Sequence, residues 1–373
     1  MRRIARYIHE LKGWPNFEWD QDLVSRKLAA VRHRQGKITG RMEALGFNLR
    51  TEATLQTLTL DVLKSSEIEG EILNPDQVRS SVARRLGLDI GGLVPSDRHV
   101  EGIVEMMIDA TQNYKKDISS KRLFDWHAAM FPTGRSGLHK IVVGKWRTNS
   151  GDDPMQVVSG PIGKERVHFE APASDRLKDE MKVFIDWFNK SNTLDAVLKA
   201  GVAHLWFVTI HPFDDGNGRV ARAIADLQLA RSDDNSQRFY SMSAQIRKER
   251  NDYYEILEKT QKGSLDITSW LEWFLTCLDR ALLATEKTLS DVLMQARFWE
   301  QHANTALNDR QRKMLGKLLD HFDGKLTTSK WAKMTKSSHD TALRDIQDLV
   351  DRKVLLKDTA GGRSSSYTVN LSN

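Results

Sequence analysis

The hydrophobic residues of this 373-residue chain recur at helical spacing over most of its length. Apolar side chains between residues 55 and 63, and again between 194 and 205, are spaced by three and four positions, which predicts amphipathic helices. Residues 155–169 differ, because two short β-prone runs there flank a Gly-Pro turn, which predicts a hairpin. The pattern therefore predicts a mainly α protein with one prominent β-hairpin.

Several helix ends are predicted from residues that start or stop helices. Gly70 is suited to the left-handed position that follows a last helical turn. Asn74, followed by a proline, is predicted to cap the next helix, and Ser174 to cap the helix after the hairpin. A further helix is predicted to stop at His211, because Pro212 disfavours the α conformation of the residue before it.

These patterns divide the chain into four expected parts. Residues 1–92 form an N-terminal helical region, residues 93–280 a helical main body, and residues 281–304 a connecting helix. Residues 305–373 are predicted to form a separate unit of three helices followed by a hairpin.

Composition narrows the picture only slightly. The 56 basic and 50 acidic residues give a net charge of +6, a mixed surface that discriminates little between partners. The single cysteine, Cys277, excludes disulfides within the chain and is predicted to be a buried thiol. The N-terminus lacks the apolar region of a signal peptide, and no apolar run approaches the ~18 residues of a membrane span. We expect a cytoplasmic protein that does not contact membranes.

The densest candidate chemistry is the segment HPFDDGNGRVAR, residues 211–222. The two glycines around Asn217 let backbone amides point to a common position at a helix N-terminus, an arrangement that binds anions. Arg219 and Arg222 share a helix face in the first turns, where two cations oppose the helix dipole. A bound anion would resolve that conflict, so we expect a nucleotide polyphosphate.

The remaining polar residues of the segment fit the same ligand. Asp215 is suited to bind Mg²⁺, which takes one or two carboxylates together with phosphate oxygens. His211 is suited to deprotonate an attacking hydroxyl group. Phe213 is expected to anchor the loop in the core, and Asp214 to point to solvent.

This segment resembles the Fic family signature, His-x-Phe-x-Asp/Glu-Gly-Asn-Gly-Arg-x-x-Arg, at every fixed position. Family members are mostly helical and typically transfer AMP from ATP to a hydroxyl group of a target protein. The resemblance implies His211 as general base and Asp215 as Mg²⁺ ligand, and it implies a set of phosphate-binding residues: Gly216, Asn217, Gly218, Arg219 and Arg222, with Arg222 on the γ-phosphate. The intact glycines favour AMP transfer over phosphorylation.

The resemblance also assigns roles outside the segment. In the family a hairpin, the flap, aligns the target by strand pairing, which implies these contact residues: Val157, Val158, Ser159 and Gly160. Three residues resemble the family positions on the adenine side of the nucleotide: Tyr253, Tyr254 and Gln261. The alternative for the hairpin is a surface hairpin without function. The alternative for the three adenine-side residues is that they are ordinary helix residues.

A second motif, SSEIEGE at residues 65–71, crowds three glutamates at a helix C-terminus, where the helix dipole disfavours acids. Taken alone, these are solvated charges. Ser65-x-x-x-Glu69-Gly70 nevertheless resembles the inhibitory helix of Fic proteins. The resemblance implies that Glu69 pairs with Arg222 in place of the γ-phosphate, because a carboxylate satisfies an arginine as a phosphate does.

The C-terminal unit resembles a winged helix-turn-helix. In a DNA-binding copy, one set of side chains would face the major groove: Ser337, Ser338, His339, Thr341 and Arg344. Arg363 would reach the DNA backbone. Asp340, Asp345 and Asp348 dilute the positive charge of this helix, which favours a protein-interaction or dimer-positioning role, and the family suggests a symmetric homodimer.

The leading hypothesis is thus an Mg²⁺-dependent protein adenylyltransferase, inhibited by Glu69, that uses ATP to modify a Tyr, Thr or Ser hydroxyl of a target or of itself. A second hypothesis is a transcription regulator whose Fic core senses a nucleotide. A third is an enzyme that removes AMP, with Glu69 positioning the water.

Overall fold

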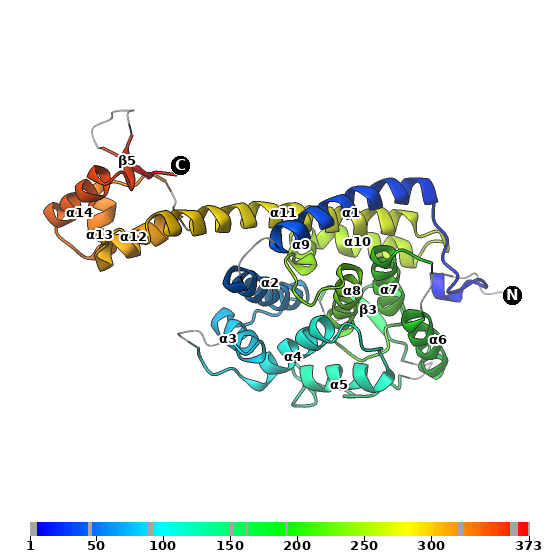
Figure 1. The fold of residues 1–373 in the computed structure, drawn as a ribbon. Helices are drawn as coiled ribbons and strands as arrows, with labels where there is room; N and C mark the ends of the chain where they lie inside the picture. The colour runs from blue at the N-terminus through cyan, green and yellow to red at the C-terminus, as the bar shows by residue number, and fades with distance from the viewer. Residues whose placement is uncertain are drawn as a thin grey trace. The chain divides into compact units, whose positions relative to one another are not determined.

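The structure is a computed structural model that describes residues 6–371, apart from 44–46, 89–92, 150–152, 162, 191–192, 320–321, 323 and 359–364. The chain forms two compact units, residues 1–286 (unit 1) and 287–373 (unit 2), which we describe separately (Figure 1). Among the described residues, no helix has the combined length and apolar character needed to cross a membrane.

Unit 1 is built mainly from helices, as the sequence predicts. In chain order these are η1 (Ile8–Glu10), α1 (Gln21–Glu43), α2 (Phe47–Ile68), α3 (Pro75–Arg85), α4 (Arg98–Gln112), α5 (Ser120–Met130), η2 (Ser174–Arg176), α6 (Leu177–Asn189), α7 (Ala196–Ile210), α8 (Asn217–Asp233), α9 (Met242–Lys248), α10 (Arg250–Gln261) and the first part of α11 (Thr268–Gln301).

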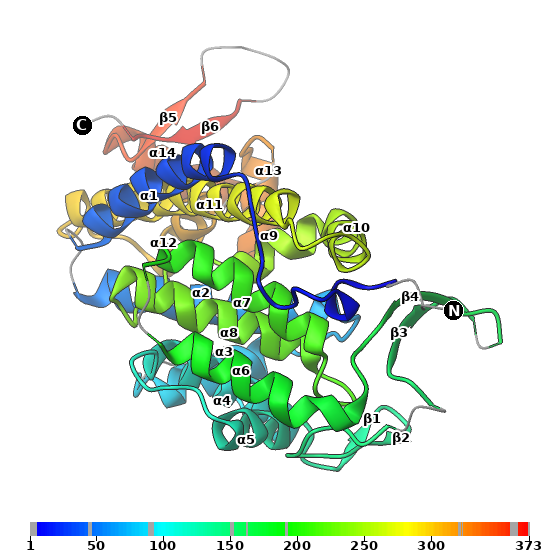
Figure 2. The same cartoon turned by 90° about the vertical axis from the view of Figure 1, so that its right-hand side faces the viewer.

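Two small antiparallel hairpins complete unit 1, and Figure 2 shows both at one edge of the helical body in that view. Their strands are β1 (Arg135–Ser136) with β2 (His139–Lys140), and β3 (Gln156–Ser159) with β4 (Arg166–Glu170). The second hairpin confirms the one predicted from residues 155–169. The register shifts between Val157 and Val158. Among the described residues β3 pairs with β4 alone, so its other edge has no strand partner.

Helix α7 is the centre of unit 1. Every residue from Val197 to Ile210 is buried, which a helix reaches only when other elements surround it. Helix α11 approaches closely at Gly201, where a Cβ atom would lie 3.1 Å from the Phe274 ring. The Trp270 indole also donates to the Gly201 carbonyl at 2.8 Å. Helix α7 is therefore held closely against α11 at Gly201.

Most predicted helix ends agree with the structure, and one does not. Gly70 has φ +86° two residues after the end of α2, and the Asn74 side chain accepts from two amides of α3. Ser174 does not cap a helix. It lies in the short turn η2 and donates to the Asn149 carbonyl, because α6 begins only at Leu177.

Unit 2 has its own core around the fully buried Trp331. It contains α12 (Asp309–Leu319), α13 (Thr328–Thr335), α14 (His339–Asp351), β5 (Leu355–Lys357) and β6 (Tyr367–Val369), in the predicted order. Asp345 is 6% exposed and bound by Arg310 at 2.7 Å, so it does not dilute the charge of an exposed face as we expected. Arg363 lies outside the described residues.

Candidate active site

His211 is the residue directly after α7 and has a left-handed backbone, with φ 52°. Its amide bonds to the Phe207 carbonyl at 3.0 Å. The ring Nδ1 lies 3.1 Å from the Val208 carbonyl, which can only accept, so Nδ1 carries the proton and Nε2 is the acceptor. Burial lowers the pKa of His211 to about 4, so the ring is neutral near pH 7. The side chain is thus prepared to accept a proton at Nε2.

The left-handed conformation of His211 costs on the order of 1–3 kcal/mol and needs support from its surroundings. Arg147 supplies it, because its Nε donates to the His211 carbonyl at 2.7 Å and its backbone amide to the Pro212 carbonyl at 2.9 Å. Arg147 is 2% exposed, and burial lowers its pKa to about 10. Sequence reasoning missed this residue, since nothing near it in the chain points to residue 211.

Phe213 anchors the loop after His211, as expected, and is fully buried. His127 of α5 stacks on it with ring centroids 4.2 Å apart. The His127 Nδ1 accepts from the Gly144 amide at 3.1 Å, so Nε2 donates to the Asp215 carbonyl, also at 3.1 Å. Burial lowers the pKa of His127 to about 4. This second histidine therefore fixes the loop without titrating near neutral pH.

The loop opens onto the N-terminus of α8. Gly216 has φ +81°, which favours glycine. The Asn217 side chain accepts from the Phe213 amide at 2.9 Å and donates to the Phe213 carbonyl at 2.8 Å, so its side chain closes the loop. A Cβ atom at Gly218 would lie 2.2 Å from Glu69 Oε1. An anionic oxygen thus already sits against the backbone where we expected a phosphate.

Arg222 is buried and directed at the end of α2. Its Nε donates to the Ser65 hydroxyl at 2.9 Å, and its Nη2 donates to the Ser65 carbonyl at 2.9 Å and to Glu69 Oε1 at 2.7 Å. Its Nη1 has no hydrogen-bond partner among the described residues. The Arg222 guanidinium can therefore donate a further hydrogen bond, from Nη1, to an anionic oxygen beside Glu69.

Arg219 does not share an anion with Arg222, because it has its own carboxylate. Its Nη1 donates to Glu71 Oε2 at 2.9 Å, and the other Glu71 oxygen is bound by His99 Nε2. The His99 Nδ1 meets the Met130 carbonyl at 2.9 Å, so both ring nitrogens donate and the ring carries a charge. The hydrogen bond to Glu71 raises the pKa of His99 accordingly.

The two acids of the loop are placed differently from each other. Asp215 Oδ2 accepts from Ser136 and lies 3.8 Å from Arg219 Nη2, and its side chain is 41% exposed. Asp214 accepts from the Val142 amide at 2.8 Å and is half-buried, so it does not point to solvent as we expected. Among the described residues no group of three or more acids, histidines or cysteines surrounds Asp215. Asp215 Oδ1 also accepts from the Gly216 amide at 2.5 Å. A single, partly exposed carboxylate fits an Mg²⁺ ion that takes its other ligands from phosphates and water.

These elements surround a cavity of about 600 Å³, within the usual range for a small-molecule site. It collects most of the residues singled out in the sequence: Glu69, Val157, Val158, Ser159, His211, Asp215, Gly216, Asn217, Gly218, Tyr253, Tyr254 and Gln261. Four others do not line it: Gly160, Arg219, Arg222 and Ser65. Gly160 lies at the hairpin turn with φ +105°.

The adenine-side residues of the expected set are held by polar contacts within the wall. Tyr253 is 1% exposed and its hydroxyl bonds to His204 Nε2 at 2.9 Å, and Gln261 donates to Thr209 at 3.2 Å. The Tyr254 hydroxyl donates to Glu69 Oε2 at 3.2 Å. Burial, reinforced by the Glu69 charge, raises the pKa of Tyr254 to about 12, so this hydroxyl remains a donor.

Comparison with known protein families agrees with this geometry. Residues 117–229 match the family described as Fic/DOC. This part of the chain is a Fic domain. Residues 7–88, which carry α1, α2 and Glu69, match a family described as a domain of unknown function, DUF4172.

Curated proteins similar to this chain include the protein adenylyltransferase Fic of Drosophila yakuba, 26% identical over 269 residues, which covers 70% of this chain and 48% of the relative. Protein adenylyltransferase fic-1 of Caenorhabditis elegans is 28% identical over 182 residues, which cover 48% of this chain and 32% of the relative. The chain thus spans about half the length of the Drosophila relatives it matches, or less for fic-1.

Solved structures show the same fold. A Fic family protein from Desulfovibrio desulfuricans G20 superposes with a TM-score of 0.55 at 20% identity, covering 94% of this chain and 97% of that one. A Fic domain containing signaling protein from Bacteroides thetaiotaomicron VPI-5482 gives 0.51 at 18% identity, covering 72% and 97%.

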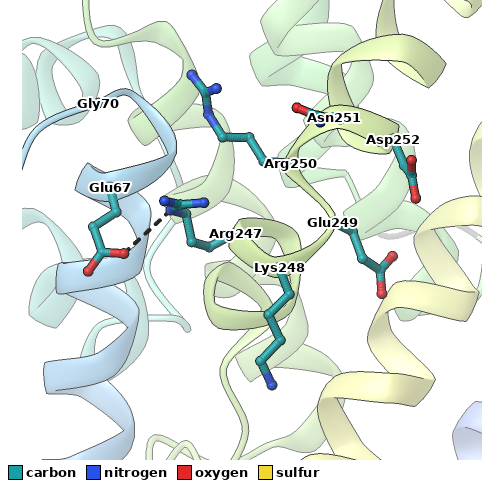
Figure 3. Close-up of a pocket in the computed structure, with 8 residues that line it drawn as sticks. All are labelled: Glu67, Gly70, Arg247, Lys248, Glu249, Arg250, Asn251 and Asp252. Atoms are coloured by element: carbon teal, nitrogen blue, oxygen red, sulfur yellow. Dashed lines mark ion pairs between the residues drawn. The ribbon is translucent and has the colours of Figure 1, made fainter.

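A second hollow, of about 480 Å³, lies at the end of α2 and shares Arg250 with the first cavity (Figure 3). Glu67 pairs there with Arg247 at 3.4 Å. Three cationic side chains line it, Arg247, Lys248 and Arg250, against three anionic ones, Glu67, Glu249 and Asp252. Because these charges balance, the hollow offers no net attraction to a charged ligand.

Proposed function

We propose that this chain is a protein adenylyltransferase that transfers AMP from ATP to a Tyr, Thr or Ser hydroxyl, and that Glu69 holds it inactive. The observation that carries the proposal is the position of the Glu69 carboxylate. It lies against Gly218 and 2.7 Å from Arg222 Nη2, at the N-terminus of a helix. Helix N-termini and arginines are the groups that bind phosphates, so Glu69 occupies a phosphate position.

In the proposed reaction, the amides at the start of α8 and the Arg222 guanidinium hold the polyphosphate. The His211 Nε2 takes the proton of the attacking hydroxyl, whose oxygen bonds to the α-phosphorus while pyrophosphate leaves. Asp215 would hold Mg²⁺, which when bound neutralises phosphate charge. Positioning and charge stabilisation supply most of the rate of such transfers.

The names of the curated relatives support AMP transfer, and the intact Gly216-Asn217-Gly218 segment agrees with it. Because β3 has a single strand partner among the described residues, the hairpin supports a role for the flap in aligning an extended target segment by strand pairing. The symmetric homodimer, DNA binding by residues 305–373 and the cytoplasmic location stay predictions.

The test is label transfer from α-³²P-ATP with Mg²⁺ to proteins of a cell lysate. We expect little transfer by the unmodified protein and strong transfer by Glu69→Gly. The double variant Glu69→Gly with His211→Ala should lose transfer by about 10²–10⁴-fold, the usual contribution of a general base. No transfer by Glu69→Gly would contradict the proposal, provided the variant remains folded.

Removal of AMP is a second candidate, because Glu69 lines the same cavity and could orient a water. That reaction predicts that Glu69→Gly loses the release of AMP from an adenylylated protein. Inhibition instead predicts that Glu69→Gly gains transfer, so the same variant separates the two functions.

A further inference from the structure

Residues 6–20, which precede α1, run across unit 1 as a strap. Figure 2 shows this strap, in dark blue, passing from α1 to the base of the β3–β4 hairpin. At the end next to α1, the Glu18 amide donates to the Leu265 carbonyl at 2.9 Å, and the Ile267 amide donates to the Glu18 carbonyl at 2.8 Å. The strap is thus fixed to the connection between α10 and α11.

The other end of the strap packs on the flap. The Tyr7 ring meets the Phe169 ring of β4 edge-on, with centroids 5.2 Å apart, and His9 meets the same ring at 5.6 Å. Tyr7 and Phe169 form one buried cluster with Ala171, and Val157 packs against it. Because Phe169 is the register partner of Val157, the strap supports the strand pair that carries a proposed target-aligning residue.

The middle of the strap packs on α7. The rings of Trp14 and Phe17 meet the Trp206 ring edge-on, with centroids 6.2 and 5.8 Å apart. The Trp14 indole also donates to Glu180 of α6 at 2.8 Å. Trp206 is buried in the last two turns of α7, the helix that ends beside His211. One short segment therefore contacts both the flap and the helix that presents the proposed general base.

These two contacts bear on the distance between the reacting groups. A target hydroxyl aligned on β3 has to reach His211 Nε2, and a misplacement of about 1 Å can cost on the order of 10²-fold in rate. Tyr7 is not among the described residues that line the cavity, and within that set its hydroxyl has no hydrogen-bond partner. What Tyr7 contributes is therefore the packing of its ring.

We propose that Tyr7 is a positioning residue for AMP transfer. Through Phe169 it fixes the flap against α7, and so holds an aligned target hydroxyl within reach of His211. This inference rests on the proposed function. Tyr7 is the first residue of the match to DUF4172, so this N-terminal region meets the site at two places, with Tyr7 at the flap and Glu69 at the proposed phosphate position.

The experiment measures label transfer from α-³²P-ATP, at saturating ATP, to proteins of a cell lysate by the full-length Glu69→Gly protein carrying a further change. Tyr7→Ala should slow transfer at least about tenfold. Its affinity for ATP in calorimetry should stay unchanged, because the residue lies outside the cavity lining. Tyr7→Phe should retain full transfer, since it keeps the ring and loses a hydroxyl that no described residue binds.

A double variant tests whether Tyr7 acts through the flap. Phe169→Leu should slow transfer as Tyr7→Ala does. Combining the two changes should cost little more than either alone, because both remove the same ring contact.

Val24→Ala is the matched control. Val24 is buried in α1, within the same N-terminal region but beyond the strap, so its truncation loosens that region and leaves the ring contacts of the strap in place. Equal slowing by Val24→Ala, additive losses in the double variant, a matching loss of ATP affinity or full transfer by Tyr7→Ala would each overturn the inference and leave the proposed function standing. No transfer by Glu69→Gly itself would defeat both.

Discussion

Gly218 shows how strongly a single position constrains the site. A Cβ atom there would meet Glu69 Oε1 at 2.2 Å and Arg222 Nη1 at 3.3 Å. Any anionic oxygen that replaces Glu69 would meet the same methyl group. The glycine is therefore required by the close approach of a ligand to the backbone, and its conformation plays no part.

We accordingly expect Gly218→Ala, introduced into the Glu69→Gly protein, to weaken ATP binding by at least about tenfold, a loss of roughly 1.4 kcal/mol. Isothermal titration calorimetry would measure it. The control is Gly36→Ala in α1, where the added methyl group meets no atom within 4 Å. That change should leave ATP binding intact and stabilise the fold by up to about 1 kcal/mol. Unchanged ATP affinity in Gly218→Ala would argue against phosphate binding at this amide.

The Glu71–His99 pair gives the α2 C-terminus a dependence on pH. The pKa of His99 is raised in the folded protein by its bond to Glu71, so the charged pair contributes stability below the ordinary histidine pKa. That contribution is lost as pH rises through the raised value. The depressed pKa of Glu71 adds no change in this range, because its contribution is lost only in acid.

Raising the pH from about 6 to about 9 should therefore loosen the α2 end and increase ATP affinity of the unmodified protein. Fluorescence titration with a nucleotide analogue across this range would show it. In His99→Gln the affinity should change much less with pH. An equal pH dependence in both proteins would assign the effect to another group.

At the scale of helices, α4 and α5 pack at backbone distance. A Cβ atom at Gly102 of α4 would lie 1.7 Å from the Ala129 carbonyl oxygen of α5. Gly102→Ala forces these helices apart, and overpacking of this kind typically costs about 1–3 kcal/mol. Urea denaturation should show a lower midpoint with an unchanged slope. Because α5 carries His127, ATP binding should weaken as well, whereas Gly36→Ala should lower neither.

The same scale explains what the sequence could and could not predict. Gly70, Asn74 and Pro212 act on their immediate neighbours, so they marked the ends of α2, α3 and α7 correctly. The prediction for Ser174 was wrong because the short turn η2 comes before α6. Whether a helix or a short turn starts at Ser174 depends on the loop whose Asn149 carbonyl accepts from its hydroxyl, and this loop is distant in the chain.

Within the site, the motif at residues 211–222 identified the loop and the helix, but not their supports. His127 and Arg147 reach the loop from distant parts of the chain and carry no local pattern that points to it. The partner of Arg219 was missed for a related reason. Glu71 was visible as one of three crowded acids, but only packing shows which acid meets which arginine.

At the scale of the whole chain, units 1 and 2 have separate cores, which predicts separate unfolding. We expect two transitions in scanning calorimetry. ATP at about 100 times its Kd should add roughly 2.7 kcal/mol to unit 1 of the Glu69→Gly protein and leave the other transition unchanged. Trp331→Ala should lower only the unit 2 transition, because truncating a buried tryptophan costs about 3–5 kcal/mol. A single transition that moves as one in both experiments would contradict this division.

The contacts of Arg222 have a consequence for how little must move. Two of its three hydrogen bonds to residues 65–69 go to Ser65 in α2, and only one goes to Glu69, which directly follows α2. If the carboxylate withdraws, the two bonds to Ser65 still hold the guanidinium in its orientation. The Nη2 donor that bound Glu69 is then free, next to Nη1, which has no partner among the described residues. An incoming nucleotide has to replace a side chain, while the helix that carries it stays docked.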